Sequence, residues 1–133
     1  TFYQAVKGVT AATHIVRPGG IILVLAACDE GAGAGEFSRL LMESDSAETF
    51  LREIADRPVT IDQWQLEKLA LAAQSHRLWF YTPGLPPEYH PKLWGNSFST
   101  AAQALEALAA AVPPQAPVAV IPEGPYVFAR LRR

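Results

Sequence analysis

The sequence predicts an α/β fold, a layered sandwich in which a mainly parallel sheet is flanked by helices. The run at residues 20–28 is apolar along almost its whole length and rich in β-branched residues, as expected of a parallel strand covered on both faces. Apolar, strand-like segments alternate along the chain with segments of helical periodicity, which favours a parallel sheet. With 133 residues, 50% of them hydrophobic, the chain suits one domain, residues 1–133, with a sizeable core.

The first segment, residues 2–16, has the periodicity of an amphipathic helix. Its apolar face carries Phe2, Ala5, Val6, Val9, Ala12 and Val16. The opposite face carries Tyr3, Gln4, Lys7, Ala11 and His14. Gln4 and Lys7 are three residues apart, so their side chains project together. An amide beside an ammonium can orient a small carboxylic acid, but an ordinary solvated helix face gives the same pattern.

A glycine-rich loop follows the first strand, with Gly31, Gly33 and Gly35 at alternate positions. Parallel sheets bind ligands at the carboxyl ends of their strands, and glycines let backbone amides approach an anion closely. The loop lacks the G-x-G-x-x-G spacing of a dinucleotide site. Its pattern fits both a site for a small anion or partner and a simple crossing loop.

Residues 36–44, 46–56 and 60–75 are predicted to form three further helices. Ser46 is a candidate N-cap of the second, and Thr60-Ile61-Asp62-Gln63 matches the Thr-x-x-Gln capping box at the start of the third. The third helix has a core stripe of Leu66, Leu69, Ala70 and Ala73. Trp64 falls almost opposite this stripe, so we expect it to be partly exposed. Packing under a second layer, lining a site and contacting another domain all remain open for Trp64.

The second half of the chain is predicted to supply more strands and one helix. The aromatic run at residues 78–82 predicts a strand, and residues 94–98 are a candidate for a very short one. Ser99 is predicted to cap a helix that ends before Pro113. Residues 117–121 are predicted to be a third apolar strand, and residues 126–131 a terminal strand or tail.

Composition and charge exclude several classes of function. Eleven basic and thirteen acidic residues give a net charge of −2, and the only basic run is at residues 130–133, so we expect no nucleic-acid partner. No apolar run reaches about 18 residues, and no signal-peptide pattern opens the chain, so we expect no membrane partner and a cytoplasmic location. Because the chain opens in a helix at Thr1 and not at Met, we expect it to be one domain of a longer protein.

No catalytic or metal-binding motif is recognisable in the chain. His14, His76 and His90 are widely separated, and no cluster has the spacing of zinc ligands. Cys28 would be a nucleophile only if the glycine-rich loop lowered its pKa, and we interpret it as a small buried residue. We therefore predict no catalytic residue and no metal site in this chain by itself.

Five segments, in their order and spacing, carry a resemblance to a known family. They are Tyr3-Gln4-Ala5-Val6-Lys7-Gly8, Val16-Arg17-Pro18-Gly19-Gly20, the strand ending at Cys28, the Gly31-x-Gly33 loop and Asp62-Gln63-Trp64-Gln65. Together they resemble the C-terminal domain of the nickel-dependent lactate racemase family, and the resemblance covers essentially the whole chain.

The resemblance implies a parent protein that racemises or epimerises 2-hydroxy acids. Its nickel pincer cofactor, made from a pyridinium nucleotide, would take a hydride from the substrate carbon and return it to either face. The N-terminal domain of such a protein would supply the proton-transferring histidines, the cofactor-linked lysine and the nickel-binding histidine. The resemblance therefore implies that the present domain is inactive and without cofactor when isolated.

The resemblance also implies roles for four residues of this chain. Gln4 and Lys7 would contact the small 2-hydroxy acid, and Tyr3 and Trp64 would line the cofactor or substrate pocket. The partner would be the protein's own N-terminal domain. The alternative is a non-catalytic α/β binding or scaffolding module that uses the glycine-rich loop for an anion or a partner.

Overall fold

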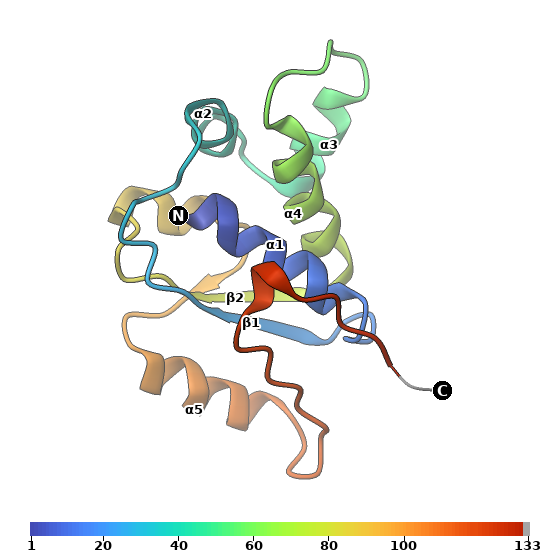
Figure 1. Cartoon of the computed structure of the whole chain (residues 1–133), viewed down its shortest axis with the longest axis vertical. Helices are drawn as coiled ribbons and strands as arrows, with labels where there is room; N and C mark the ends of the chain where they lie inside the picture. The colour runs from blue at the N-terminus through green and yellow to red at the C-terminus, as the bar shows by residue number, and fades with distance from the viewer. Residues whose placement is uncertain (132–133) are drawn as a thin grey trace.

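A three-stranded parallel sheet forms the centre of the molecule in the computed structural model, which describes residues 1–131 (Figure 1). The strands are β1 (Ile21–Leu25), β2 (Arg77–Tyr81) and β3 (Asn96–Ser97), in the order β1-β2-β3. β1 and β2 pair over their full length, from Ile21 opposite Arg77 to Leu25 opposite Tyr81. The predicted α/β class and parallel sheet are confirmed. Arg132 and Arg133, part of the basic terminal run, lie outside the described residues.

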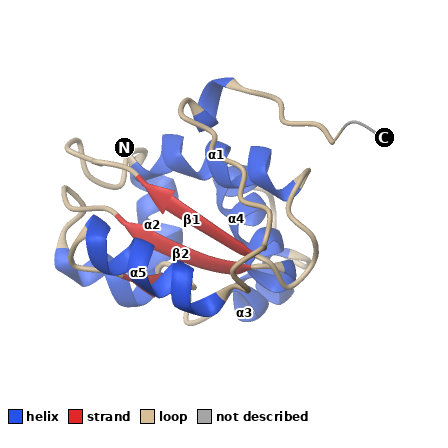
Figure 2. Ribbon diagram, turned by 90° about the horizontal axis from the view of Figure 1, so that it is seen from below, coloured by secondary structure: helices blue, strands red, loops and turns tan. Residues whose placement is uncertain are grey.

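Within residues 1–131, five α-helices surround the sheet: α1 (Phe2–Thr13), α2 (Gly35–Glu43), α3 (Ala47–Ile54), α4 (Gln63–Ser75) and α5 (Ala101–Ala111). Two short 3₁₀ helices, η1 (Pro87–Lys92) and η2 (Gly124–Tyr126), lie in the connecting segments. Figure 1 and Figure 2 show α1 to α4 on one side of the sheet and α5 on the other. None of the helices in the described residues is long and apolar enough to cross a membrane.

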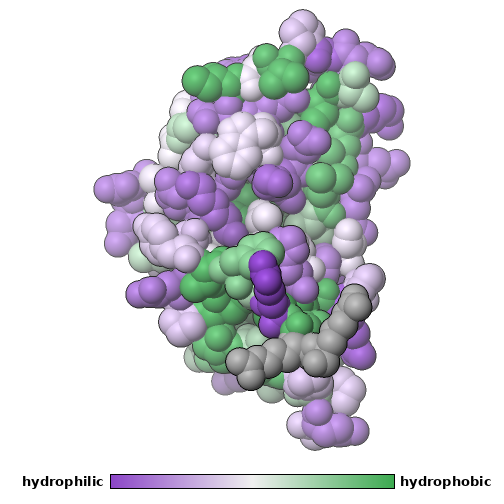
Figure 3. Space-filling view, turned by 45° about the vertical axis from the view of Figure 1, so that its right-hand side comes forward, coloured by the Kyte–Doolittle hydropathy of each residue, from purple (hydrophilic) through white to green (hydrophobic). Residues whose placement is uncertain are grey.

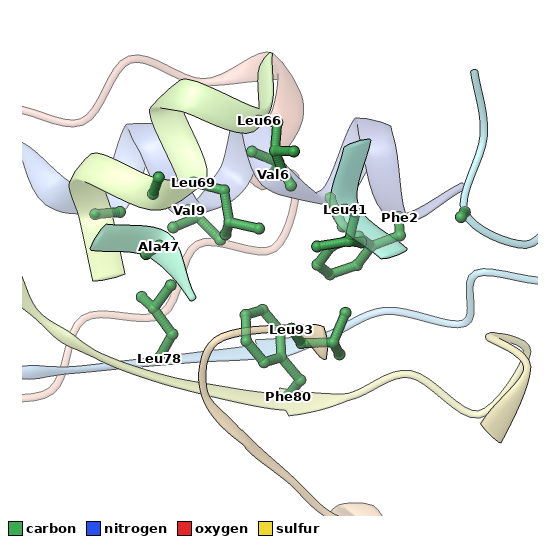
Figure 4. Close-up of a cluster of buried hydrophobic side chains, with 14 of the residues drawn as sticks. Phe2, Val6, Val9, Leu41, Ala47, Leu66, Leu69, Leu78, Phe80 and Leu93 are labelled. Carbon is green, nitrogen blue, oxygen red and sulfur yellow. The ribbon is translucent and has the colours of Figure 1, made fainter. Parts of the chain in front are cut away.

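The main hydrophobic core lies between the sheet and the layer that contains α1 and α4. Figure 4 shows part of this core, with side chains of both helices directed towards those of β2. Phe2 and Phe80 are fully buried and meet edge to face, with ring centroids 5.6 Å apart. Each buried side chain of this size contributes about 2–3 kcal/mol to folding. The apolar stripe predicted for residues 2–16 is therefore the core face of α1 as far as Ala12.

The outer face of α1 differs in one respect from the prediction. Ala11, which the helical pattern places with the exposed residues, is buried. α1 packs against α4 and η2 as well as against β1, so more than one side of the helix is covered. The helix also ends at Thr13, and the partly exposed Val16 lies beyond it.

The C-terminal segment does not form the strand predicted at residues 117–121, and residues 126–131, predicted as a terminal strand or tail, contain no strand. Ala119 and Ile121 line a cavity of about 230 Å³ beside β1 without pairing with that strand. Val118 and Val120 are exposed, so this apolar run is not a covered strand. Prolines flank this run at Pro117 and Pro122, and they limit the length over which it could pair with β1. β3 does form within the predicted short strand at residues 94–98.

Two of the three predicted helix starts change position. The Ser46 side chain accepts a hydrogen bond from the Thr49 N–H at 3.0 Å, so this N-cap is confirmed. α5 is capped by Thr100 rather than Ser99. α4 begins at Gln63 rather than near Thr60, because Asp62 occupies the N-cap position; its conformation is described with the candidate site below.

Candidate functional site

Three of the four predicted site residues gather where the first turns of α1 and α4 lie side by side. The rings of Tyr3 and Trp64 meet edge to face, with centroids 6.3 Å apart. The Lys7 Nζ atom lies 5.8 Å from the centroid of the Tyr3 ring, within the range of a cation–π contact. Gln4 is exposed on the same turn of α1. We call Tyr3, Gln4, Lys7, Asp62 and Trp64 the α1–α4 face.

Tyr3 is the most constrained residue of this face. Its phenol donates a hydrogen bond to Asp62 Oδ1 at 3.1 Å, and its backbone N–H donates to the Ala32 carbonyl at 2.9 Å. The fully buried Gln65 donates from Nε2 to the Tyr3 carbonyl at 2.9 Å. The ring of Phe37 packs against the Tyr3 ring at 5.3 Å. The position of Tyr3 is thus set by contacts from three other segments of the chain.

The protonation state of Tyr3 follows from these contacts. Partial burial raises the pKa of the phenol above its usual value, and the hydrogen bond to Asp62 and the charge of that carboxylate raise it further. A raised pKa favours the protonated form. Tyr3 therefore remains a neutral hydrogen-bond donor to Asp62 throughout the physiological pH range.

The glycine-rich loop packs against the start of α1. The carbonyls of Gly31 and Ala32 accept hydrogen bonds from the N–H groups of Phe2 and Tyr3, each at 2.9 Å. The first N–H groups of a helix have no partner within the helix, and here the loop supplies one for two of them. Gly33 has φ +105°, and a Cβ atom there would lie 2.8 Å from the Tyr3 Cβ. The loop therefore fixes the position of Tyr3, with its carbonyls directed at α1.

Cys28 has the environment of a structural residue. It is buried at the end of the segment that follows β1, and its backbone has a φ of 53°. Burial raises the pKa of the thiol, which is the opposite of what an activated nucleophile requires. The interpretation of Cys28 as a small buried residue is confirmed.

The three histidines lie in separate places, as their sequence spacing indicates. His14 is exposed at the end of α1 and packs against the ring of Phe128, with centroids 5.1 Å apart. His76 ends α4, with its Nε2 atom 3.1 Å from the Val16 carbonyl oxygen. His90 lies in η1. Among residues 1–131, no group of three or more His, Cys, Asp or Glu side chains is placed to hold a metal ion.

Sequence reasoning gave no role to Asp62. Half of the predicted capping box forms, because the Gln63 side chain accepts a hydrogen bond from the Thr60 N–H at 3.2 Å. The helix nevertheless begins at Gln63, because Asp62 adopts a left-handed backbone conformation with φ 62° and ψ −3° and occupies the N-cap position itself. An acidic residue directly before a helix start was the signal in the sequence that could have singled out Asp62. Its hydrogen-bond partner, Tyr3, is 59 residues away, so no local pattern joins the two.

Trp64 lies on the solvent side of α4, as its position opposite the core stripe predicts. Its side chain is 47% exposed, and Leu71, one heptad further along, is also exposed. The apolar residues Val59 and Ile61 of the α3–α4 loop extend this exposed surface. Figure 3 shows the apolar atoms at the end of the molecule where Figure 1 places this loop. Large contiguous apolar patches are typical of surfaces that contact a ligand or another domain, and the exposed residues at this end of α4 make it a candidate for such a contact.

Replacing Trp64 by Ala is expected to lower the free energy of unfolding of this chain by about 1 kcal/mol, because the ring is not part of the core. The matched control is Trp79→Ala, since Trp79 is only 7% exposed on β2. That variant should lose about 3–5 kcal/mol. Urea unfolding monitored by circular dichroism measures both values. Equal losses would show that Trp64 is ordinary packing.

The fold and the α1–α4 face define a small α/β domain that presents a cation and two aromatic rings on one exposed surface. A family model described as the lactate racemase C-terminal domain matches residues 1–129, and the chain belongs to this family. The resemblance found in the sequence is thereby confirmed.

Individual relatives agree with this assignment. The chain is 29% identical over 131 residues to the lactate racemase of Thermoanaerobacterium thermosaccharolyticum, a match that covers 96% of this chain and 31% of that protein. It is 32% identical over 125 residues to the lactate racemase of Lactiplantibacillus plantarum, covering 92% of this chain and 30% of the relative. The solved structure of the lactate racemase apoprotein from T. thermosaccharolyticum superposes with a TM-score of 0.82 and 27% identity, over 98% of this chain and 32% of that one. The chain thus spans about a third of the length of these relatives.

Proposed function

We propose that this chain is the domain that holds the substrate carboxylate in a racemase or epimerase of 2-hydroxy acids. The observation that carries the proposal is the α1–α4 face, where the Lys7 ammonium lies beside the Tyr3 ring and the Tyr3 ring contacts Trp64. The ion pairs found within residues 1–131 do not involve Lys7, so its charge is available to a ligand. The names of the relatives support a small hydroxy acid as that ligand.

The side chains of the face suit a carboxylate and a neighbouring hydroxyl group. A carboxylate is an acceptor only, and Lys7 brings a compact positive charge with three donors. Gln4 is exposed on the same turn of the helix and brings amide donors together with an acceptor for a substrate hydroxyl. Two such residues orient a small acid without taking part in bond cleavage.

The side chains of the same face suit packing against the cofactor, but they do not suit coordination of its nickel ion. Trp64 and Tyr3 are partly exposed aromatic residues, and such rings suit a flat pyridinium nucleotide. When bound, a nickel pincer nucleotide supplies the acceptor for a hydride from the substrate carbon. We propose that the residues that coordinate nickel and move the proton lie in the remaining two thirds of the parent protein, the part that relatives have in addition to this domain.

The scaffolding alternative assigned an anion to the glycine-rich loop. It has less support, because the loop packs against α1 with its Gly31 and Ala32 carbonyls accepting from the Phe2 and Tyr3 N–H groups. The Gly31 N–H, which could otherwise bind an anion, donates to the Cys28 carbonyl at 2.8 Å.

The isolated 133-residue chain is expected to fold, to show no racemase activity and to bind nickel at background level. Its histidines and cysteine lie in separate places and do not make a coordination shell. Metal analysis after desalting tests this expectation. Nickel that stays at about one equivalent per chain would contradict it.

The proposed function is tested with the full-length protein and installed cofactor. We expect interconversion of the two enantiomers of at least one 2-hydroxy acid, measured by chiral chromatography over a panel of such acids. Protein in which the cofactor is installed but which converts no member of the panel would overturn the proposal.

A further inference from the structure

We infer that Asp62 is a positioning residue, which holds the Tyr3 side chain and, through it, the arrangement of Lys7 and Trp64. The inference rests on the proposed function and deepens it, because it adds to the site a residue with no expected contact to the substrate. Three observations carry it: Asp62 accepts a hydrogen bond from Tyr3, its side chain does not cap its own helix, and its backbone is left-handed.

The carboxylate of Asp62 forms its hydrogen bond with a residue of α1 and not with its own helix, α4. An Asp in the N-cap position ordinarily accepts a hydrogen bond from an N–H group of the first helical turn, which stabilises the helix. At the start of α4 this side-chain cap is absent. The carboxylate instead accepts the phenol hydrogen of Tyr3 at 3.1 Å, across 59 residues of sequence.

The backbone of Asp62 is unfavourable for a residue with a side chain. Its φ of 62° lies in the left-handed region, which residues other than glycine rarely adopt, although Asp and Asn tolerate it better than most. Strain of this kind persists where surrounding contacts determine the geometry. Here those contacts include the Tyr3 phenol and the buried Gln65, whose amide holds the Tyr3 carbonyl from the same helical turn.

Tyr3 transmits the effect to the rest of the face. Its ring has Trp64 against one edge at 6.3 Å and the Lys7 ammonium at 5.8 Å. With the phenol hydrogen bonded to Asp62, the ring has one orientation, and both neighbours pack against it. Loss of this bond removes the contact that fixes the phenol end of the ring, while Phe37 still packs against the ring. The ring then supports Lys7 and Trp64 less well.

The test is a double-mutant cycle in the full-length protein with installed cofactor. Asp62→Gly keeps the left-handed backbone and removes the carboxylate, and Tyr3→Phe removes the hydroxyl. We expect each change to lower kcat/KM for a 2-hydroxy acid by about 5- to 30-fold, the equivalent of one partly buried hydrogen bond to a charged group. Because both variants remove the same bond, the double variant should lose no more than either single variant. Asp62→Asn keeps an acceptor oxygen and should retain activity within about 3-fold of the wild type.

A matched control and a second readout separate positioning from a general loss of stability. Asp56→Gly removes an exposed Asp from the same interhelical segment, and its activity should stay within about 2-fold of the wild type. In Asp62→Gly, the pKa of Tyr3 should fall toward its usual value, because the hydrogen bond and the charge that help to raise it are gone. NMR titration of tyrosine labelled at Cζ reports this pKa directly. Tyr3→Phe tests the same bond from the other side if Asp62→Gly fails to fold.

The outcomes distinguish this inference from the proposed function. Losses that add in the double variant, or full activity in Asp62→Gly, would overturn the positioning role while the wild type remained a racemase. An unchanged Tyr3 pKa in Asp62→Gly would overturn the contact itself. A wild-type protein with cofactor but without racemase activity would remove the proposed function, and the positioning role with it.

Discussion

Replacing Lys7 by Ala is expected to lower kcat/KM of the full-length enzyme by about 10- to 150-fold, the largest effect of a single change on the proposed site. The variant removes a charge-assisted contact to the substrate carboxylate, which is worth about 1.5–3 kcal/mol when largely desolvated. Folding should change little, because the core residues Phe2, Val6 and Val9 lie on the other side of α1 and Ala is a good helix former. Kinetics and urea unfolding of the same preparations measure both quantities.

The control for Lys7→Ala is Arg17→Ala, which removes a cation from an exposed position beyond the end of α1. This variant should keep activity within about 2-fold of the wild type, since Arg17 is not part of the α1–α4 face. If Lys7→Ala melts the domain while each folded molecule keeps normal activity, Lys7 is structural and the site assignment fails.

Gly33→Ala is expected to lower the free energy of unfolding by about 3–5 kcal/mol, as much as truncation of the buried Trp79. Alanine would have to adopt a φ of +105°, which is strained for any residue with a Cβ atom. Its methyl group would also lie only 2.8 Å from the Tyr3 Cβ. Gly31→Ala is the matched control, because Gly31 has a φ of +70° but open space around its Cβ position. It should lose only the backbone term, about 1–2 kcal/mol. Gly35→Ala, with neither strain nor a close neighbour, should be neutral or slightly stabilising.

This series separates two views of the glycine-rich loop. A loop that packs against Tyr3 predicts the order Gly33, Gly31, Gly35 in lost free energy of unfolding, measured by urea denaturation. A loop that is free to bind an anion predicts equal and small losses at Gly31 and Gly33. The second result would restore the scaffolding interpretation.

Much of the fold follows from local patterns in the sequence. The apolar run at residues 20–28 predicts a parallel strand, and β1 forms within it, although β1 is an edge strand in which only Ile22 is buried. The aromatic run before Pro83 predicts β2, the central strand, where Leu78, Trp79 and Phe80 are buried. The helical periodicity of residues 2–16 predicts which side of α1 faces the core. The exposure of Gln4 follows from this periodicity, and that of Trp64 follows from the core stripe of α4, because the side opposite a core stripe has no internal partner.

The remaining features depend on contacts that no local pattern encodes. Residues 117–121 have the composition of a strand, but the edge of β1 is left unpaired beside them. The capping box at Thr60 is a sound local signal, yet the left-handed conformation of Asp62 moves the helix start to Gln63. The hydrogen bond between Asp62 and Tyr3 joins residues 59 positions apart, and only the packing of α1 against α4 brings them together.

The most direct test of the account is the structure of the full-length protein with cofactor and a 2-hydroxy acid bound. The account predicts a carboxylate oxygen at about 3 Å from the Lys7 Nζ atom, with the amide of Gln4 in reach and Trp64 covered by the cofactor or the N-terminal domain. An acid bound elsewhere, with Lys7 and Trp64 still facing solvent, would contradict it.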